Sequence, residues 1–155
     1  MPCIHLGQLS SSCRYALWHI QEPATTLYPQ VIFSATDQAT YDHLQHPLKQ
    51  QQFLAARLAL QQLILPLIPS YQGLAKEANG QPLLPHAPWY VSLSHSQDLA
   101  IATIDRHPLG IDLQYPQEKL QRIQTKFLQP TEITHCQQNI HQLCYAWCVK
   151  EAVYK

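Results

Sequence analysis

Alternation of apolar and polar residues predicts four short strands in this chain. They cover residues 16–20, 89–96, 99–104 and 109–114. A short turn at 96–98 separates the second run from the third, so we expect these two strands to form a hairpin. In the fourth run a glycine, Gly110, stands two residues before an acid, Asp112, which indicates close approach of another backbone or of a ligand.

Helical periodicity is clearest over residues 49–65, a run that ends at Pro66. An earlier helix is expected to begin at Ser34 or Thr36, with Asp37 near its positive end. The spacing of Leu120, Ile123 and Phe127 predicts a helix that begins near residue 116. A final helix is expected to begin at Asn139 and to continue to the last residue given.

Arg57 lies in the apolar stripe of the long helix, beside Phe53 and Leu60. An arginine in that position needs a partner, because burial of an unpaired charge is costly. Two interpretations follow. The side chain either lies at the edge of the core and reaches out to water, or reaches into a cleft and binds an anion.

Composition places the chain among globular proteins. It has 155 residues, 46% of them apolar and 13% charged, and this length suits one domain. The formal net charge is zero, which argues against non-specific nucleic-acid binding. No run approaches the ~18 apolar residues of a membrane span, and the first residues lack the pattern of a signal peptide. We therefore expect a cytoplasmic monomer, whose five cysteines suit reduced thiols better than disulfides.

The final helix carries the most informative set of charges. Glu151 and Lys155 lie one turn apart on one face, and Cys144 and Cys148 continue that stripe. Lys150 points about 100° round the helix. One face therefore presents a carboxylate and an ammonium with a second ammonium beside them, the combination that metal and phosphate chemistry needs.

Three motifs now stand in order along the chain. They are Ser92-Leu93-Ser94-His95-Ser96, then Gly110-Ile111-Asp112, then Trp147-Cys148-Val149-Lys150-Glu151-Ala152-Val153-Tyr154-Lys155. In this order and spacing the chain resembles the 4′-phosphopantetheinyl transferases, specifically the larger type that acts on carrier proteins of peptide and fatty-acid synthesis. The segment 53–57 is similar to the family's N-terminal helix, and the resemblance runs from about residue 33 onward.

The family implies an α+β fold made of a pseudo-twofold pair of similar α/β subdomains. We expect an N-terminal subdomain over residues 1–105 and a C-terminal one over 106–155, with coenzyme A in the cleft between them. Family members normally continue for several tens of residues beyond the last motif. We therefore expect a C-terminally truncated chain whose second subdomain is incomplete, or else a second half of minimal size.

The resemblance also implies a reaction, the holo-acyl-carrier-protein synthase activity. The phosphopantetheine arm of coenzyme A is transferred to a serine of an acyl or peptidyl carrier protein, with Mg²⁺ required and adenosine 3′,5′-bisphosphate released. Carried over by position, Asp112 and Glu151 would hold Mg²⁺, and Glu151 would also take the serine proton.

The basic and hydroxyl residues of the motifs receive roles in the same way. Lys155 would contact the phosphates, and Lys150 would pair with the charge cluster or help to position the pyrophosphate. Ser94 and His95 would meet the 3′-phosphoadenosine end of coenzyme A, with Arg57 nearby.

Two positions depart from the family pattern. Gln114 stands where many members carry a second acid, and Gln81 replaces the lysine of a Gly-Lys-Pro turn, for which Lys76 is a candidate substitute. The departure at Gln114 and the early end keep a second hypothesis open, in which the chain is a non-catalytic relative that binds coenzyme A or a carrier protein.

A third hypothesis concerns zinc. Histidines and cysteines gather within a short stretch before and inside the final helix, at His135, Cys136, His141, Cys144 and Cys148. The last three fall near one helix face, although the spacing matches no usual zinc knuckle. The alternative is that Cys144 and Cys148 are small core residues.

Overall fold

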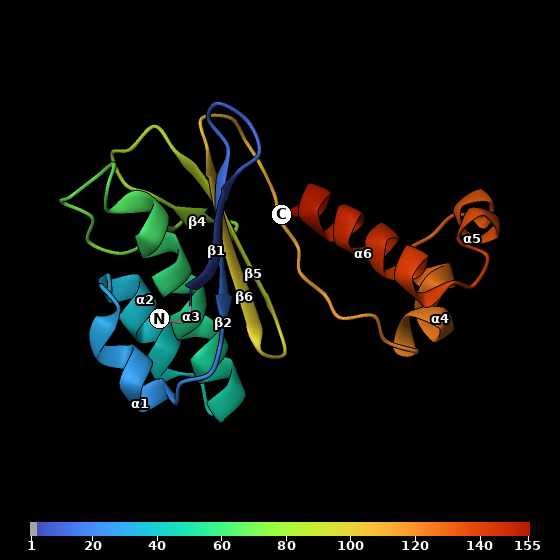
Figure 1. Cartoon of the computed structure of the whole chain (residues 1–155), viewed down its shortest axis with the longest axis horizontal. Helices are drawn as coiled ribbons and strands as arrows, with labels where there is room; N and C mark the ends of the chain where they lie inside the picture. The colour runs from blue at the N-terminus through green and yellow to red at the C-terminus, as the bar shows by residue number, and fades with distance from the viewer. Residues whose placement is uncertain (1–2) are drawn as a thin grey trace.

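A six-stranded antiparallel sheet organises the computed structural model, which describes residues 3–155 (Figure 1). Its strand order is β1-β2-β6-β5-β4-β3. The strands are β1 (Cys3–Gln8), β2 (Arg14–His19), β3 (Ala75–Lys76), β4 (Pro82–Leu83), β5 (Tyr90–Ser96) and β6 (Leu99–Asp105). The predicted hairpin is confirmed as β5 and β6, whose turn places Gln97 at a φ of 51°.

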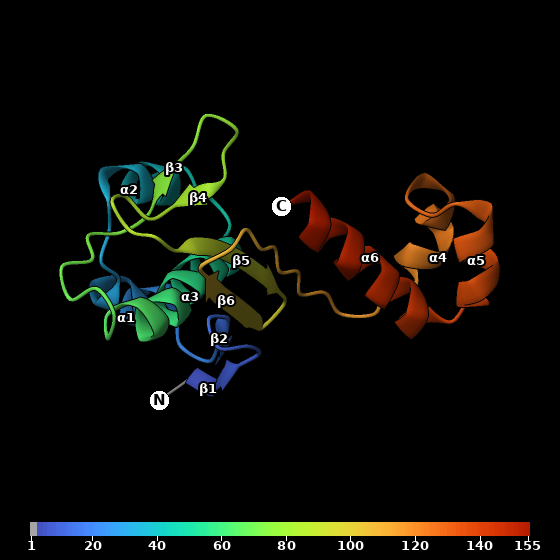
Figure 2. The same ribbon diagram turned by 90° about the horizontal axis from the view of Figure 1, so that it is seen from above.

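One face of the sheet is covered by helices (Figures 1 and 2). They are α1 (Ala24–Leu27), the short 3₁₀ turn η1 (Tyr28–Gln30), α2 (Ala35–Asp42) and α3 (Pro47–Ile64). The predicted long helix is confirmed as α3. It packs against β2 and β6, and this packing buries nearly every residue after its second turn. Of the two predicted N-caps, Ser34 and Thr36, it is Ser34 that caps α2, and its hydroxyl accepts the N–H of Asp37.

The last part of the chain forms a separate helical unit on the other side of the sheet (Figure 1). It contains α4 (Lys119–Ile123), the 3₁₀ turn η2 (Gln124–Lys126), α5 (Pro130–Cys136) and α6 (Ile140–Tyr154). It has its own core, which includes Leu120, Leu128, Leu143 and Cys144. Asn139 caps α6 as predicted, since its side-chain oxygen accepts the N–H groups of His141 and Gln142.

The fold is α+β, as expected. Residues 106–155, all of which the structure describes, contain helices and no strand. The pseudo-twofold relation between two subdomains and the boundary at residues 105 and 106 stay predictions. Among the described residues no helix has both the length and the apolar character needed to span a bilayer.

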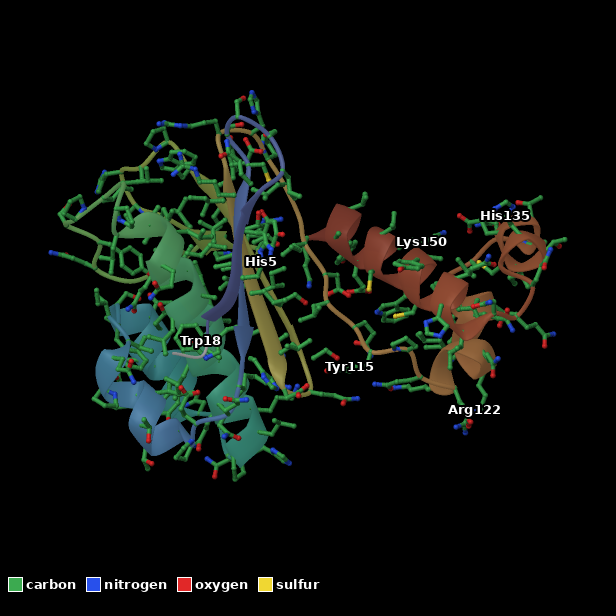
Figure 3. All side chains as sticks on the ribbon, viewed as in Figure 1. His5, Trp18, Tyr115, Arg122, His135 and Lys150 are labelled. Carbon is green, nitrogen blue, oxygen red and sulfur yellow. The ribbon has the colours of Figure 1, made fainter. Side chains whose placement is uncertain are left out.

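The prediction of a strand over residues 109–114 is wrong. This segment is extended but joins no ladder, because β5 already has β6 on one side and β4 at its start on the other. It runs instead across the open face of the sheet toward the helical unit, and Figure 3 labels Tyr115 at its end. We call residues 109–115 the crossing segment.

Candidate functional site

Three serines of β5 hold the crossing segment on the sheet. The hydroxyls of Ser92, Ser94 and Ser96 accept the backbone N–H groups of Ile111, Leu113 and Tyr115, at 3.0, 3.0 and 3.3 Å. Because side chains of a strand alternate between its faces, residues 92, 94 and 96 all point to the face opposite α3. Each serine is at most 7% exposed. The crossing segment thus satisfies alternate amides with side-chain hydroxyls in place of a neighbouring strand.

This arrangement brings Asp112 beside the end of α6. Its Oδ1 lies 2.6 Å from Nζ of Lys155 and 2.9 Å from Oγ of Ser94. Nζ of Lys155 also donates to the carbonyl of Ile111 at 3.1 Å and to Oγ of Ser94 at 3.2 Å. The Asp112 side chain is 9% exposed and that of Lys155 is 31% exposed. The two motifs that the sequence singled out, Gly110-Ile111-Asp112 and the end of the final helix, are therefore in direct contact.

The remaining contacts between α6 and the crossing segment are close. A Cβ on Gly110 would lie 1.7 Å from the carbonyl oxygen of Ala152, so only glycine fits there. This confirms the expectation that Gly110 marks the approach of another backbone. About two turns earlier in α6, Sγ of Cys144 donates to the carbonyl of Gln114 at 3.3 Å. Burial, together with the charges and hydrogen bonds of Cys144 and Asp112, raises the pKa of Cys148 to about 12, which keeps that thiol protonated.

A cleft of about 740 Å³ opens beside this cluster. Its walls come from α3, the β3–β4 turn, the middle of β5, the crossing segment and the end of α6. The polar and charged lining residues are Arg57, Lys76, Asn79, Gln81, Ser92, Ser94, His95, Asp112, Tyr154 and Lys155. Five residues that the sequence analysis proposed for coenzyme A or Mg²⁺ therefore line one cavity. They are Arg57, Ser94, His95, Asp112 and Lys155.

Arg57 has the partner that its apolar surroundings required. Its Nε and Nη2 donate to Oδ1 of Asp37 at 3.1 and 2.8 Å, and its guanidinium lies 3.4 Å from the centre of the Phe53 ring. Asp37 is 1% exposed and accepts the N–H of Leu74 through its other oxygen. Burial lowers the pKa of Arg57, and the charge of Asp37 opposes that shift. The sequence carries no local sign that Asp37, twenty residues earlier, is this partner.

His95 lies on the opposite side of β5 from Ser94, facing α3. Burial is the main cause that lowers its pKa, and the charges of Lys49, Lys155 and Arg57 lower it further. Its Nδ1 is buried and has no hydrogen-bond partner among the described residues. The ring is therefore neutral at pH 7 and lies among cations, an environment that favours an anion.

Lys150 and Glu151 are not among the lining residues of the cleft. Nζ of Lys150 lies 2.8 Å from Oε2 of Glu132, in the capping box at the start of α5. Glu151 lies one turn before Lys155 and is partly buried; its backbone carbonyl accepts the N–H of Lys155, and its carboxylate makes no hydrogen bond to the described residues. The roles assigned to both stay predictions.

The zinc hypothesis gains no support. Within residues 3–155 no group of three histidine, cysteine or acidic side chains has an arrangement that suits a metal ion. Cys136 and Cys144 belong to the core of the helical unit instead, where they pack with Leu143. Trp147 lies in the same core, edge-on to Phe127 at 4.9 Å.

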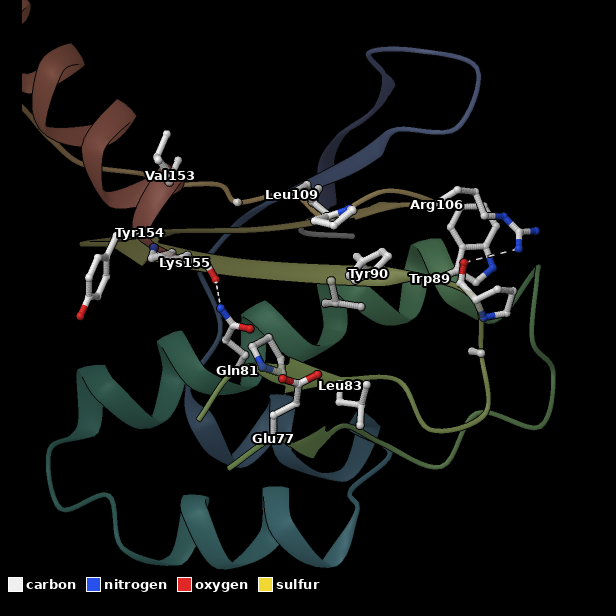
Figure 4. Close-up of a pocket in the computed structure, with 17 residues that line it drawn as sticks. Glu77, Gln81, Leu83, Trp89, Tyr90, Arg106, Leu109, Val153, Tyr154 and Lys155 are labelled. Atoms are coloured by element: carbon white, nitrogen blue, oxygen red, sulfur yellow. Dashed lines mark hydrogen bonds between the residues drawn. The ribbon is translucent and has the colours of Figure 1, made fainter. Parts of the chain in front are cut away.

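A second hollow, of about 1050 Å³, lies on the other side of the Gln81–Lys155 contact (Figure 4). Nε2 of Gln81 donates to the carbonyl of Lys155, so the residue that replaces the family's lysine holds the end of α6. The guanidinium of Arg106 stacks on Trp89 at 4.0 Å in the opposite wall. Lys76, the candidate substitute, lines the cleft, and its Nζ donates to Thr40 at 3.0 Å.

Comparison with known protein families identifies part of the chain. The family model described as the 4′-phosphopantetheinyl transferase N-terminal domain matches residues 44–105. This range covers α3 and four of the six strands, β3, β4, β5 and β6, and therefore the helix that supplies Arg57 and the strand that supplies Ser94 and His95. No curated protein matches the sequence.

Proposed function

We propose that the chain transfers the phosphopantetheine arm of coenzyme A to a serine of an acyl or peptidyl carrier protein, a proposal that the match of residues 44–105 to the N-terminal domain of the 4′-phosphopantetheinyl transferase superfamily supports. The serine oxygen attacks the β-phosphorus of coenzyme A. The bond to the bridging oxygen breaks, and adenosine 3′,5′-bisphosphate leaves with that oxygen.

The observation that carries this proposal is the contact between Asp112 and Lys155 at the edge of a cleft lined by further cations. A phosphoryl group in transfer needs positive charge around its oxygens. Lys155 supplies a charge that is partly exposed and held by three acceptors, so it is already oriented. The match to the family model ends at residue 105. The contact between Asp112 and Lys155 lies beyond that range, so it supports the proposal independently of the match.

The donor set is compatible with Mg²⁺, which prefers carboxylate oxygens completed by phosphate and water. Asp112 presents such an oxygen at the cleft, and we propose that Asp112 and Glu151 would hold the ion, which would neutralise charge on the pyrophosphate. Lys155 would contact the same phosphates. In this proposal Glu151 also accepts the proton of the attacking serine, directly or through water, and Lys150 orients the end of α6 from its pair with Glu132.

We assign the nucleotide end of coenzyme A to the part of the cleft between β5 and α3. The charges of Lys49, Lys155 and Arg57 act on His95 there, so a 3′-phosphate would be attracted to this part of the cleft, and its own charge would favour protonation of the ring. Arg57 donates hydrogen bonds to Asp37, so we propose that it attracts the 3′-phosphate through its positive charge and not through those hydrogen bonds. The resemblance assigns Ser94 to this end as well, but its hydroxyl contacts Asp112 and Lys155.

The test is the mass of the carrier. The protein is incubated with coenzyme A, Mg²⁺ and an apo carrier protein, and the carrier is weighed by mass spectrometry. A gain equal to one phosphopantetheine group supports the enzyme, and Glu151→Gln should abolish it while the circular dichroism spectrum is unchanged. Coenzyme A binding without transfer would favour the non-catalytic relative, and neither binding nor transfer would overturn both proposals.

A further inference from the structure

We propose that Ser94 is a positioning residue for Asp112 and that its hydroxyl does not bind coenzyme A. The inference rests on the proposed function in one respect, the assignment of Asp112 as a ligand of Mg²⁺. The starting observation is that the Ser94 hydroxyl contacts both the backbone of the crossing segment and the carboxylate that this segment carries.

The hydrogen-bonding capacity of this hydroxyl is already used in full. A serine hydroxyl has one proton to donate and two lone pairs to accept with. Its proton goes to Oδ1 of Asp112 at 2.9 Å, and it accepts from the N–H of Leu113 at 3.0 Å and from Nζ of Lys155 at 3.2 Å. Ser94 is also 6% exposed. A nucleotide phosphate would have to displace one of these partners to reach it.

Ser94 differs from the two neighbouring serines of β5 in the partners of its hydroxyl. Ser92 and Ser96 each accept one amide of the crossing segment, two residues to either side, and among the described residues neither hydroxyl contacts a carboxylate. They fix the path of the backbone. Ser94 fixes that path next to Asp112 and also the direction of the Asp112 side chain, which holds its carboxylate against Lys155.

The end of the crossing segment is held independently, so the loss of one serine should not release the whole segment. The hydroxyl of Tyr115 donates to Asp98 at 2.7 Å, in the β5–β6 turn. At the other end, Gly110 lies against the backbone of Ala152. Removal of the Ser94 hydroxyl should therefore act locally, on Leu113 and Asp112.

A carboxylate that binds a metal depends on such support. Loss of a residue that hydrogen-bonds a metal ligand usually lowers metal affinity or activity by about 10- to 100-fold. We therefore expect Ser94→Ala to raise the Mg²⁺ concentration for half-maximal coenzyme A binding by at least about tenfold. At saturating Mg²⁺ the affinity for coenzyme A should return to within twofold of that of the wild-type protein, because the hydroxyl does not touch the nucleotide.

The experiment compares Ser94→Ala with Ser94→Thr, which keeps the hydroxyl, and with Ser96→Ala, which removes one amide acceptor far from Asp112. Calorimetry gives the Mg²⁺ requirement for coenzyme A binding. Amide exchange by NMR reports on Leu113 and Tyr115, and the χ1 couplings of Asp112 report on its rotamer without any ligand. Ser94→Ala should speed exchange at Leu113 and average the couplings, Ser94→Thr should restore both, and Ser96→Ala should affect Tyr115 alone.

Two results would overturn the proposal. One is a single Asp112 rotamer in Ser94→Ala with the wild-type Mg²⁺ requirement. The other is a loss of coenzyme A affinity that saturating Mg²⁺ does not restore, which would indicate direct contact with the nucleotide. A wild-type protein that binds no coenzyme A would overturn the proposed function, and the Asp112 couplings would still decide the positioning role. Should Ser94→Ala not fold, Ser94→Cys keeps the shape of the side chain and weakens its hydrogen bonds.

Discussion

The ammonium of Lys155 lies 2.6 Å from the carboxylate of Asp112, and this pair joins the end of α6 to the crossing segment. The two side chains are unequally buried, at 9% exposed for Asp112 and 31% for Lys155. Removal of the Asp112 carboxylate therefore has a different consequence from removal of the Lys155 ammonium. Lys155 without Asp112 can turn to water, whereas Asp112 without Lys155 keeps a charge in a nearly closed site.

The first prediction is that Lys155→Met destabilises the protein more than Asp112→Asn. Asp112→Asn should cost less than about 1 kcal/mol of unfolding free energy, the range of a partly exposed ion pair. Lys155→Met should cost about 2 kcal/mol, because it leaves a buried charged group without its strongest partner. Both should lower transfer about 100-fold or more.

Urea denaturation measures the difference, and the double variant closes a mutant cycle. Lys119→Met, at an exposed position at the start of α4, is the matched control for loss of a lysine and should behave as the wild type. Equal stability losses for the two single variants would contradict the burial argument. A transfer rate unchanged in either variant would remove that residue from its proposed role.

The second prediction concerns Gly110. Gly110→Ala should drive the end of α6 away from the crossing segment, because the new Cβ would lie 1.7 Å from a carbonyl oxygen that belongs to backbone. We expect a cost of about 1–3 kcal/mol, typical of overpacking. Hydrogen exchange should become faster at the backbone amides of residues 148–154 and stay unchanged in α3.

Gly80→Ala is the control for this variant. Gly80 has a φ of 88° and nothing lies within 4 Å of a Cβ there, so the substitution strains a turn without a clash. It should lower stability modestly and leave exchange in α6 as in the wild type. Faster exchange in α6 for both variants would mean that the effect of Gly110→Ala is general destabilisation.

Much of the fold could be predicted from the sequence because its signals are local. Helix α3, the β5–β6 hairpin and the caps at Ser34 and Asn139 all follow from periodicity or from one side chain and its nearest amides. The crossing segment could not be predicted. Its apolar alternation is that of a strand, and nothing in it reveals that serines of another segment satisfy its amides.

Among the strands, β1, β3 and β4 are also absent from the predictions. β3 and β4 have two residues each, too few for a period of two to be detected. In the site, the sequence indicates Asp112, Lys155 and His95 through motif order. It does not indicate that Lys150 turns to Glu132, because that pair forms only when α5 folds against α6.

The third prediction tests the buried pair of Arg57 and Asp37. Asp37→Asn should cost about 3–5 kcal/mol, because it leaves a guanidinium buried without a counter-ion. Asp42→Asn, on the exposed end of the same helix, should change stability by less than about 0.5 kcal/mol. Urea denaturation of both variants measures this contrast, and a similar small loss in each would show that Arg57 reaches water in solution.

The fourth prediction follows from the lowered pKa of His95, whose largest cause is burial and whose other causes are the charges of Lys49, Lys155 and Arg57. For a histidine whose folded pKa is depressed, the contribution to stability is full above the unfolded value near 6.5 and is lost as the pH falls through the folded value. The wild-type protein should therefore lose stability below about pH 6.5 relative to His95→Gln, with no relative change between pH 7 and 8.

Denaturation curves from pH 4.5 to 8 measure this difference, and NMR of the imidazole ring gives the midpoint directly. His135→Gln, at an exposed position of α5, should keep the wild-type slope and serves as the control. Under the proposed function, coenzyme A should raise the His95 midpoint because a nearby phosphate favours the imidazolium, and coenzyme A lacking its 3′-phosphate should not. Equal shifts with both ligands would place the 3′-phosphate away from His95, since the charge that distinguishes them would then not reach the ring.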